Sequence, residues 1–312
     1  MSNTVLLFAG QGAQEVGMAR HLPEASEAAA EVFDIASDSI DVDMREVCFA
    51  GPEQRLNRTD MCQPAILTVS IALLRALEEE LDSPLSPLAA AGLSLGEYSA
   101  LVAAGALSLP DAMRLTHARG TYMQQACDAN PGTMFSIISL EDQQVEEACR
   151  RVREEEDGRV WPANYNCPGQ VVISGEEDAA ARAAELCTEA GARRAIQLKV
   201  AGAFHSPLMQ PAADKLEEKL QQTPFTQPDY PVLANVTGDP VEDPDQIRDL
   251  LARQVTSPVR WSASMNWCVE QGAEKFIELG PGRVLRGLLR RIDRSLDCTS
   301  VNALDKVQNF EL

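Results

Sequence analysis

The sequence predicts an α/β protein in which a small βαββαβ unit is inserted into a larger α/β unit. Short apolar runs alternate with longer helical patterns, three of those runs end at glycine-rich turns, and the pattern changes after Pro131. The chain has 312 residues, enough for two units or for one core with an insertion.

The larger unit is expected at residues 1–131 and 201–312. Thr4–Phe8 is an apolar run before Gly10-Gln11-Gly12, which predicts a buried strand and a tight turn. Ser108 is a favourable N-cap with Pro110 close behind it, and its helix should run to about Cys127. The other expected helices are Ser26–Ile40, Met61–Leu81, Asp214–Gln222 and Val284–Ile292, and the other strands are Pro87–Gly92, Val232–Asn235 and Phe276–Leu279.

The inserted unit is expected at residues 132–200. Two of its strands should flank a turn at Pro168-Gly169, and a helix should lie on either side of that pair. The order of elements is typical of a ferredoxin-like unit. In chain order they are Thr133–Leu140, Glu141–Glu155, Val160–Tyr165, Gln170–Ser174, Glu176–Ala190 and Arg194–Val200.

Composition excludes several classes of protein. The net charge of −20 argues against nucleic acid and anionic membranes as partners, because both need a basic footprint. No run of about 18 apolar residues occurs, and Met1–Phe8 lacks the basic start of a signal peptide, so we expect no membrane span and a cytoplasmic protein. The eight cysteines form no CxxC pair, which favours buried thiols over disulfides or a zinc site.

The strongest local motif is Gly92-Leu93-Ser94-Leu95-Gly96, a G-x-S-x-G between an expected strand and helix. Such a turn exposes the serine hydroxyl, and the start of the following helix supplies backbone N–H groups and a positive dipole end. Although the same letters also occur in ordinary glycine-serine turns, the strand and helix around them favour Ser94 as a nucleophile.

A nucleophilic serine needs a base, and the chain has three histidines. His21 lies in a polar segment and His117 lies within a helix, whereas His205 lies in a loop between a strand and a helix, so His205 is the expected base. No Asp or Glu is singled out as a third member. On pattern alone Arg119 is a helix-surface arginine, although its planar guanidinium could bind an acyl group that carries a carboxylate.

Seven blocks of sequence together resemble a known family. They are Phe8–Gln14, Gly92–Ala100, Arg119-Gly120, Asn164–Gln170, Gly202–Ser206, Gln254 with Pro258–Trp261, and Glu278–Gly282. The chain resembles the malonyl-CoA:acyl-carrier-protein transacylases of fatty-acid synthesis, which are related to the acyltransferase domains of polyketide synthases. The blocks occur in the family's order and cover nearly the whole chain.

The resemblance implies a hydrolase-like α/β core with a ferredoxin-like insert. It also implies site roles: Ser94 as acylated nucleophile, His205 as base, the backbone N–H groups of Gln11 and Leu95 as oxyanion hole, Arg119 as partner of the malonyl carboxylate, the main-chain carbonyl of Gln254 as the group that orients the histidine, and Phe204 as a residue of malonyl-accepting members. Many members have His where this chain has Leu93, so no role is carried over to that position.

The implied reaction is ping-pong transfer of malonyl from malonyl-CoA to the phosphopantetheine arm of acyl carrier protein, with no bound cofactor and no metal. Alternatives are a discrete acyltransferase serving a polyketide synthase, a serine hydrolase or thioesterase, and a non-catalytic binding module. Two basic segments are either solvated or dock the carrier protein. They are Arg193-Arg194 and the last helix with Arg283, Arg286, Arg290, Arg291 and Arg294.

Overall fold

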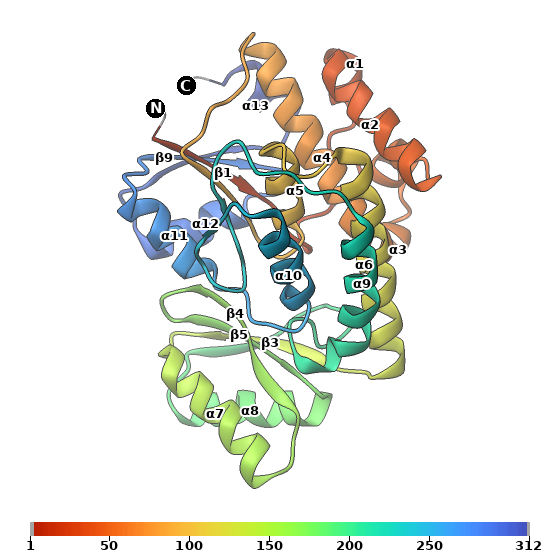
Figure 1. The fold of residues 1–312 in the computed structure, drawn as a ribbon. Helices are drawn as coiled ribbons and strands as arrows, with labels where there is room; N and C mark the ends of the chain where they lie inside the picture. The colour runs from red at the N-terminus through yellow and green to blue at the C-terminus, as the bar shows by residue number, and fades with distance from the viewer. Residues whose placement is uncertain (1–2, 311–312) are drawn as a thin grey trace.

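The computed structural model describes residues 3–310, and it is an α/β fold with two sheets (Figure 1). The described residues exclude positions 1, 2, 311 and 312. These positions are the two ends of the predicted larger unit, and the first two also begin the segment that was considered as a signal peptide. The two sheets use separate stretches of chain, and the second sheet falls within the stretch predicted for the inserted unit.

The larger sheet has six strands in the order β10-β9-β1-β2-β7-β8, parallel except for the β7–β8 pair. Its strands are β1 (Thr4–Phe8), β2 (Ala89–Gly92), β7 (Val232–Leu233), β8 (Pro240–Val241), β9 (Lys275–Leu279) and β10 (Asp297–Val301). Phe8 pairs with both Gly92 and Leu279, so the turns that follow β1, β2 and β9 meet at one edge of the sheet. The glycine-rich turns predicted from the sequence are therefore neighbours.

Helices cover both faces of this sheet (Figure 1). The helices of the larger unit are α1 (Leu22–Ala25), α2 (Glu27–Ile40), α3 (Glu53–Leu56), α4 (Thr59–Glu80), α5 (Gly96–Ala103), α6 (Leu109–Ala129), α9 (Gln210–Gln222), α10 (Pro244–Gln254), α11 (Trp261–Glu270), α12 (Val284–Ile292) and α13 (Leu304–Gln308), with a π-helical turn at Glu46–Ala50 and a 3-10 turn at Pro207–Met209.

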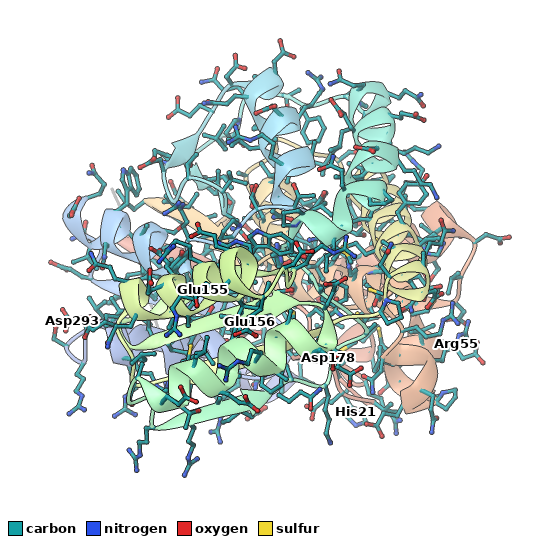
Figure 2. The ribbon with its side chains drawn as sticks, turned by 90° about the horizontal axis from the view of Figure 1, so that it is seen from below. His21, Arg55, Glu155, Glu156, Asp178 and Asp293 are labelled. Carbon is teal, nitrogen blue, oxygen red and sulfur yellow. The ribbon has the colours of Figure 1, made fainter. Side chains whose placement is uncertain are left out.

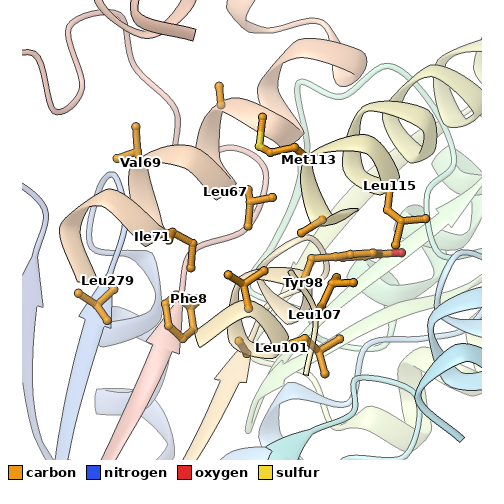
Figure 3. Packing of buried hydrophobic residues seen from close by; sticks show 14 of the residues in the cluster. Phe8, Leu67, Val69, Ile71, Tyr98, Leu101, Leu107, Met113, Leu115 and Leu279 are labelled. Carbon is orange, nitrogen blue, oxygen red and sulfur yellow. The ribbon is translucent and has the colours of Figure 1, made fainter. Parts of the chain in front are cut away.

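The core of the larger unit is built around α4. Leu67 and Ile71 of this helix pack in one cluster with Phe8 and Tyr98 (Figure 3). Within residues 3–310, α4 is the one helix long and apolar enough to cross a membrane, with 22 residues and a mean hydropathy of 1.3. Because 89% of that apolar window is buried inside the fold, α4 serves here as the central core helix.

The smaller sheet is antiparallel, with strands in the order β4-β5-β3-β6. Its elements follow the predicted βαββαβ order: β3 (Thr133–Ile138), α7 (Asp142–Glu155), β4 (Val160–Cys167), β5 (Gln170–Gly175), α8 (Glu177–Glu189) and β6 (Arg194–Gln197). The prediction that the last strand runs to Val200 is wrong, because the chain leaves the sheet after Gln197 and turns toward a cavity that Leu198 and Val200 line. Figure 2 shows this unit from below, with Glu155 and Glu156 at the end of α7.

The two sheets are joined next to that cavity. Tyr165 N donates to Val259 O and Val259 N donates to Ala163 O, each over 2.8 Å, so β4 pairs with the segment that precedes α11. This pairing joins the edge strand of the smaller sheet to the larger unit. Beside it, the cavity lies between side chains of the smaller sheet and the turns that follow β1 and β2.

Candidate active site

Ser94 lies in a strained turn between β2 and α5. Its φ is +54°, a left-handed conformation that a side-chain-bearing residue rarely adopts. A Cβ atom at Gly92 would overlap the backbone of Gly96, and one at Gly96 would overlap the backbone of Phe8. The strand and helix therefore approach closely only because both flanking positions are glycine, which is the geometry that the G-x-S-x-G motif predicted.

Asn235, two residues after β7, holds this turn from the neighbouring strand. Its Oδ1 accepts from Ser94 N at 2.6 Å, and its Nδ2 donates to Gly92 O at 2.8 Å. Both polar groups of the Asn235 side chain thus have hydrogen-bond partners in the backbone of the Ser94 turn, and these bonds hold Ser94 in its left-handed conformation. No sequence motif marks Asn235, so this role was not predictable from the sequence.

His205 lies within hydrogen-bond distance of Ser94, and both residues line the same cavity. Its Nε2 lies 2.8 Å from Ser94 Oγ, and its Nδ1 lies 2.9 Å from the main-chain oxygen of Gln254. Because a carbonyl only accepts, Nδ1 carries the proton and Nε2 is free to accept one from the serine. Burial, reinforced by the positive charge of Arg119, lowers the pKa of His205 to about 4, so the imidazole is neutral near pH 7.

Arg119 is buried beside the same serine, with only 1% of its surface exposed. Its Nη1 donates to Gln63 Oε1 at 2.7 Å, and its Nη2 donates to Gln254 Oε1 at 2.9 Å and to Ser94 Oγ at 3.1 Å. No carboxylate lies within 4.0 Å of the guanidinium in residues 3–310, and its Nε has no hydrogen-bond partner there. The interpretation of Arg119 as a helix-surface arginine, which the sequence pattern alone favoured, is therefore wrong.

A buried cation with no carboxylate in direct contact is costly, and burial accordingly lowers the pKa of Arg119. Its nearest neighbours are neutral amides, a hydroxyl and the face of Tyr98, whose ring centroid lies 5.8 Å from the guanidinium carbon. Arg119 thus lies next to Ser94 Oγ, with no anionic partner within 4.0 Å in residues 3–310.

The cavity in front of Ser94 has a volume of about 160 Å³ and lies between the two units. Residues 132–200 contribute Asn164, Asn166 and four apolar residues, and Asn166 Oδ1 is buried without a hydrogen-bond partner in the described part of the chain. Its walls are Gln11, Leu93, Ser94, Met123, Met134, Asn164, Asn166, Val172, Leu198, Val200, Phe204 and His205.

The two residues expected to form an oxyanion hole lie at this site. Gln11 lines the cavity, and Leu95 is the residue between Ser94 and the first turn of α5. Within residues 3–310, neither backbone N–H donates a hydrogen bond, so both are available to a ligand. Their distance to a bound oxyanion stays a prediction.

The remaining histidines and the cysteines take no part in this cavity. His21 is largely exposed, and His117 Nδ1 lies 3.1 Å from the main-chain oxygen of Asp60. All eight cysteines are buried and free, as predicted. No group of three His, Cys, Asp or Glu side chains that could hold a metal ion occurs among the described residues.

Known proteins match this chain over nearly its whole length. The model of the acyl transferase domain matches residues 5–308. Malonyl CoA-acyl carrier protein transacylase of Bacillus subtilis is 42% identical over 99% of this chain and 96% of its own length.

Two solved structures agree closely with the fold. An acyl carrier protein S-malonyltransferase from Vibrio cholerae superposes with a TM-score of 0.93 at 43% identity, over 97% of this chain and 98% of that one. A malonyl-transacylase in complex with its type II polyketide acyl-carrier protein has a TM-score of 0.93 at 40% identity, with 98% of each chain covered. Sequence, fold and the Ser94–His205 geometry agree, and the chain belongs to the acyl transferase domain family.

Proposed function

We propose that this chain transfers malonyl groups from malonyl-CoA to the phosphopantetheine thiol of an acyl carrier protein, through a malonyl ester on Ser94. One observation carries the proposal: the buried guanidinium of Arg119 lies 3.1 Å from Ser94 Oγ and has no carboxylate partner in residues 3–310. An acyl group that ends in a carboxylate would supply that partner. The relatives that match over full length bear the name of this activity.

In the first half-reaction, His205 Nε2 takes the proton from Ser94 Oγ as the oxygen attacks the thioester carbonyl. The tetrahedral oxyanion accepts hydrogen bonds from the N–H groups of Gln11 and Leu95, and the loss of one such donor typically costs ~10²–10³ in rate. The carbon–sulfur bond then breaks, and the coenzyme A sulfur leaves with the proton from His205.

In the second half-reaction, the carrier's thiol gives its proton to His205 and its sulfur attacks the malonyl ester. The ester bond to Ser94 breaks, and Oγ recovers the proton. The main-chain carbonyl of Gln254 keeps Nδ1 protonated through both steps, which is the task of the acid in a Ser-His-Asp triad. The reaction as written needs no bound cofactor and no metal.

Arg119 also supplies specificity for malonyl over acetyl. Acetyl-CoA has no carboxylate, so its binding would leave the desolvated guanidinium unpaired. Phe204 is 6% exposed and forms part of the cavity wall, which supports a role in limiting acyl size.

We also propose the finer architecture. The strand order β4-β5-β3-β6 with its βαββαβ chain order supports a ferredoxin-like subdomain at 132–200. A parallel sheet whose nucleophile turn follows β2 supports a hydrolase-like core formed by 1–131 and 201–312. Together these assignments place the cavity between two subdomains, where an extended pantetheine arm could enter.

The carrier protein should dock on the arginines of the α12 region. Five arginines are exposed there, and none forms an ion pair within the described residues, although the chain carries a net charge of −20. Arg291 Nη1 donates to Gln170 Oε1 at 2.8 Å, so this basic face adjoins the smaller unit. An acidic carrier would be attracted to it.

The docking proposal has a direct test. Charge reversal at Arg290 and Arg294 should raise the KM for the carrier and leave formation of malonyl-Ser94 from malonyl-CoA unchanged. An unchanged KM would indicate a solvated face and would favour Arg193-Arg194 as the alternative site.

Fatty-acid synthesis is the pathway proposed for this activity, in the cytoplasm, and polyketide synthesis is its alternative. One solved relative of 40% identity is described with a type II polyketide carrier, so that alternative has specific support. Transfer rates to a fatty-acid carrier and to a polyketide carrier, measured in parallel, would separate the two.

The proposed activity is tested by intact-protein mass after brief exposure to malonyl-CoA and an acid quench. We expect one malonyl group on the wild type and none on Ser94→Ala. Free malonate without an adduct and without a carrier would indicate a serine hydrolase instead. Neither adduct nor turnover would contradict the assignment of the acyl donor.

A further inference from the structure

Glu97 is a buried carboxylate that the mechanism above does not use. It lies in the first turn of α5 and is 2% exposed. Its Oε2 accepts from Gln254 Nε2 at 2.7 Å and from Asn235 N at 3.0 Å. One oxygen therefore joins the two residues that hold the base and the nucleophile turn.

The contact with Gln254 fixes which way its side-chain amide points. A carboxylate only accepts, so it holds the NH₂ group on its own side and leaves Oε1 to face Arg119 Nη2 at 2.9 Å. The reversed amide would present two donors to the guanidinium. Gln254 Nε2 also donates to Ser94 O at 2.9 Å, and its main-chain oxygen accepts from His205.

The contact with Asn235 anchors the nucleophile turn. Glu97 holds the backbone N–H of Asn235, and the Asn235 side chain in turn binds the peptide groups of Ser94 and Gly92. Through Asn235 and Gln254, the Glu97 carboxylate is thus connected by hydrogen bonds to the nucleophile, the base and the cation proposed to bind the acyl carboxylate. Charge-assisted bonds of this kind are about twice as strong as neutral ones.

We propose that Glu97 is a positioning residue whose carboxylate, acting through Gln254, sets the orientation of His205 and Arg119 for malonyl transfer. The inference rests on the proposed function. Glu97 touches neither the thioester nor the acyl carboxylate in this role, and its effect on rate passes through the Gln254 amide.

The charged and titratable groups around Glu97 come from three helices and one loop. Arg119 on α6 and Tyr98, the next residue on α5, interact with it electrostatically. Cys62 on α4 interacts with Arg119, and His205 is hydrogen-bonded to the main chain of Gln254. Burial raises the pKa of Glu97 to about 7, against the opposing effects of its two hydrogen bonds and of Arg119. The carboxylate form of Glu97 therefore becomes protonated as the pH falls through neutrality. His205 stays neutral over the same range, because its pKa lies at about 4.

The test is the rate of malonyl-Ser94 formation as a function of pH in wild type and Glu97→Gln. The neutral amide keeps the shape and removes the charge. We expect a loss on the order of 10- to 100-fold, as for other groups that orient a reacting side chain from behind. The acid limb of the wild-type profile near pH 7 should disappear in the variant.

Glu278→Gln is the matched control. Glu278 is equally buried, and it accepts from Leu285 N and Arg286 N at the start of α12, away from the cavity. Its replacement should lower the unfolding temperature and leave the wild-type rate and pH profile. If both variants lose rate equally with no change of profile, the loss is structural and the inference is wrong.

Gln254→Met provides a second, independent arm. It keeps the main-chain carbonyl and removes the side-chain amide, so it disconnects Glu97 from His205 and Arg119. The Gln254→Met variant should by itself lose the acid limb of the pH–rate profile. Adding Glu97→Gln to it should then lower the rate by no more than about twofold. Additive losses, or a wild-type rate and profile in Glu97→Gln, would overturn the positioning role. Absence of any adduct on the wild type would instead overturn the proposed function.

Discussion

Replacing Arg119 with Met tests the assignment of the acyl carboxylate. Met fills much of the space of the arginine stem and removes the guanidinium, which has Gln63, Gln254 and Ser94 as its only hydrogen-bond partners in residues 3–310. Removing one partner of a buried ion pair costs about 3–5 kcal/mol. At about 1.36 kcal/mol per tenfold, kcat/KM for malonyl-CoA should fall by roughly 10²–10⁴.

Acetyl-CoA is the internal control for this variant. It lacks the carboxylate, so its kcat/KM should change by less than about tenfold, since the Ser94–His205 pair remains. Both donors are assayed with the same carrier protein. Arg119→Lys, which keeps the charge without the planar fork, should lie between wild type and Met. Equal losses for malonyl-CoA and acetyl-CoA would refute the carboxylate role.

The same variant should remain folded. Burial lowers the pKa of Arg119, which means that the fold disfavours its charged form. Replacing a buried ion pair by apolar side chains is often neutral or stabilising, and removing a buried charge that has no ion-pair partner likewise removes its desolvation cost. We therefore expect an unfolding temperature at or above the wild-type value, and a fall of many degrees would show that the guanidinium supports the fold.

Three further predictions follow from the site. His205→Ala should abolish malonyl-Ser94 formation in a protein that still folds, as measured by intact mass and thermal unfolding; an adduct at the wild-type rate would exclude it as the base. Gly92→Ala should prevent folding of the elbow, because its Cβ would overlap the backbone of Gly96, and an active, stable variant would contradict that packing. Because the pKa of Glu97 is raised from 4.5 to about 7, the folded state binds the extra proton, so its contribution to the free energy of unfolding falls as the pH rises through this window. Glu97→Gln should remove this fall in denaturant titrations at several pH values, and an identical slope would count against a buried titrating carboxyl.

Elements with strong local signals were predictable from the sequence. Thr4–Phe8 is apolar from Val5 onward and is buried in the parallel sheet, and Ser108 caps α6 as its position predicted. The helix α10 was missed although Asp243 accepts from the backbone at its start and Pro244 follows, the same signal as at Ser108 and Pro110. Strand β10 was missed because it lies at the edge of the sheet, with alternating buried and exposed residues and few large apolar side chains.

The site was predictable where a motif marks it, and not where the topology assembles it. Ser94 lies in a local motif, and His205 is the one histidine in a loop of the expected kind. Asn235 lies 141 residues from Ser94 in sequence and becomes its neighbour only because β2 pairs with β7, with Ala91 opposite Leu233. Nothing within a window of the sequence carries that information, because strand order is a property of the whole sheet.

The absence of an acid at His205 follows from the presence of Arg119. A carboxylate hydrogen-bonded to His205 in place of the Gln254 carbonyl would add a negative charge to the site, and this charge would attract Arg119 in competition with an acyl carboxylate. A neutral carbonyl fixes the same tautomer without that competition. Glu97, the buried carboxylate of this site, is satisfied by Gln254 and Asn235 and forms no ion pair with Arg119 within 4.0 Å. Amides thus separate the buried anion from the buried cation, and the cation stays available to a substrate that brings its own charge.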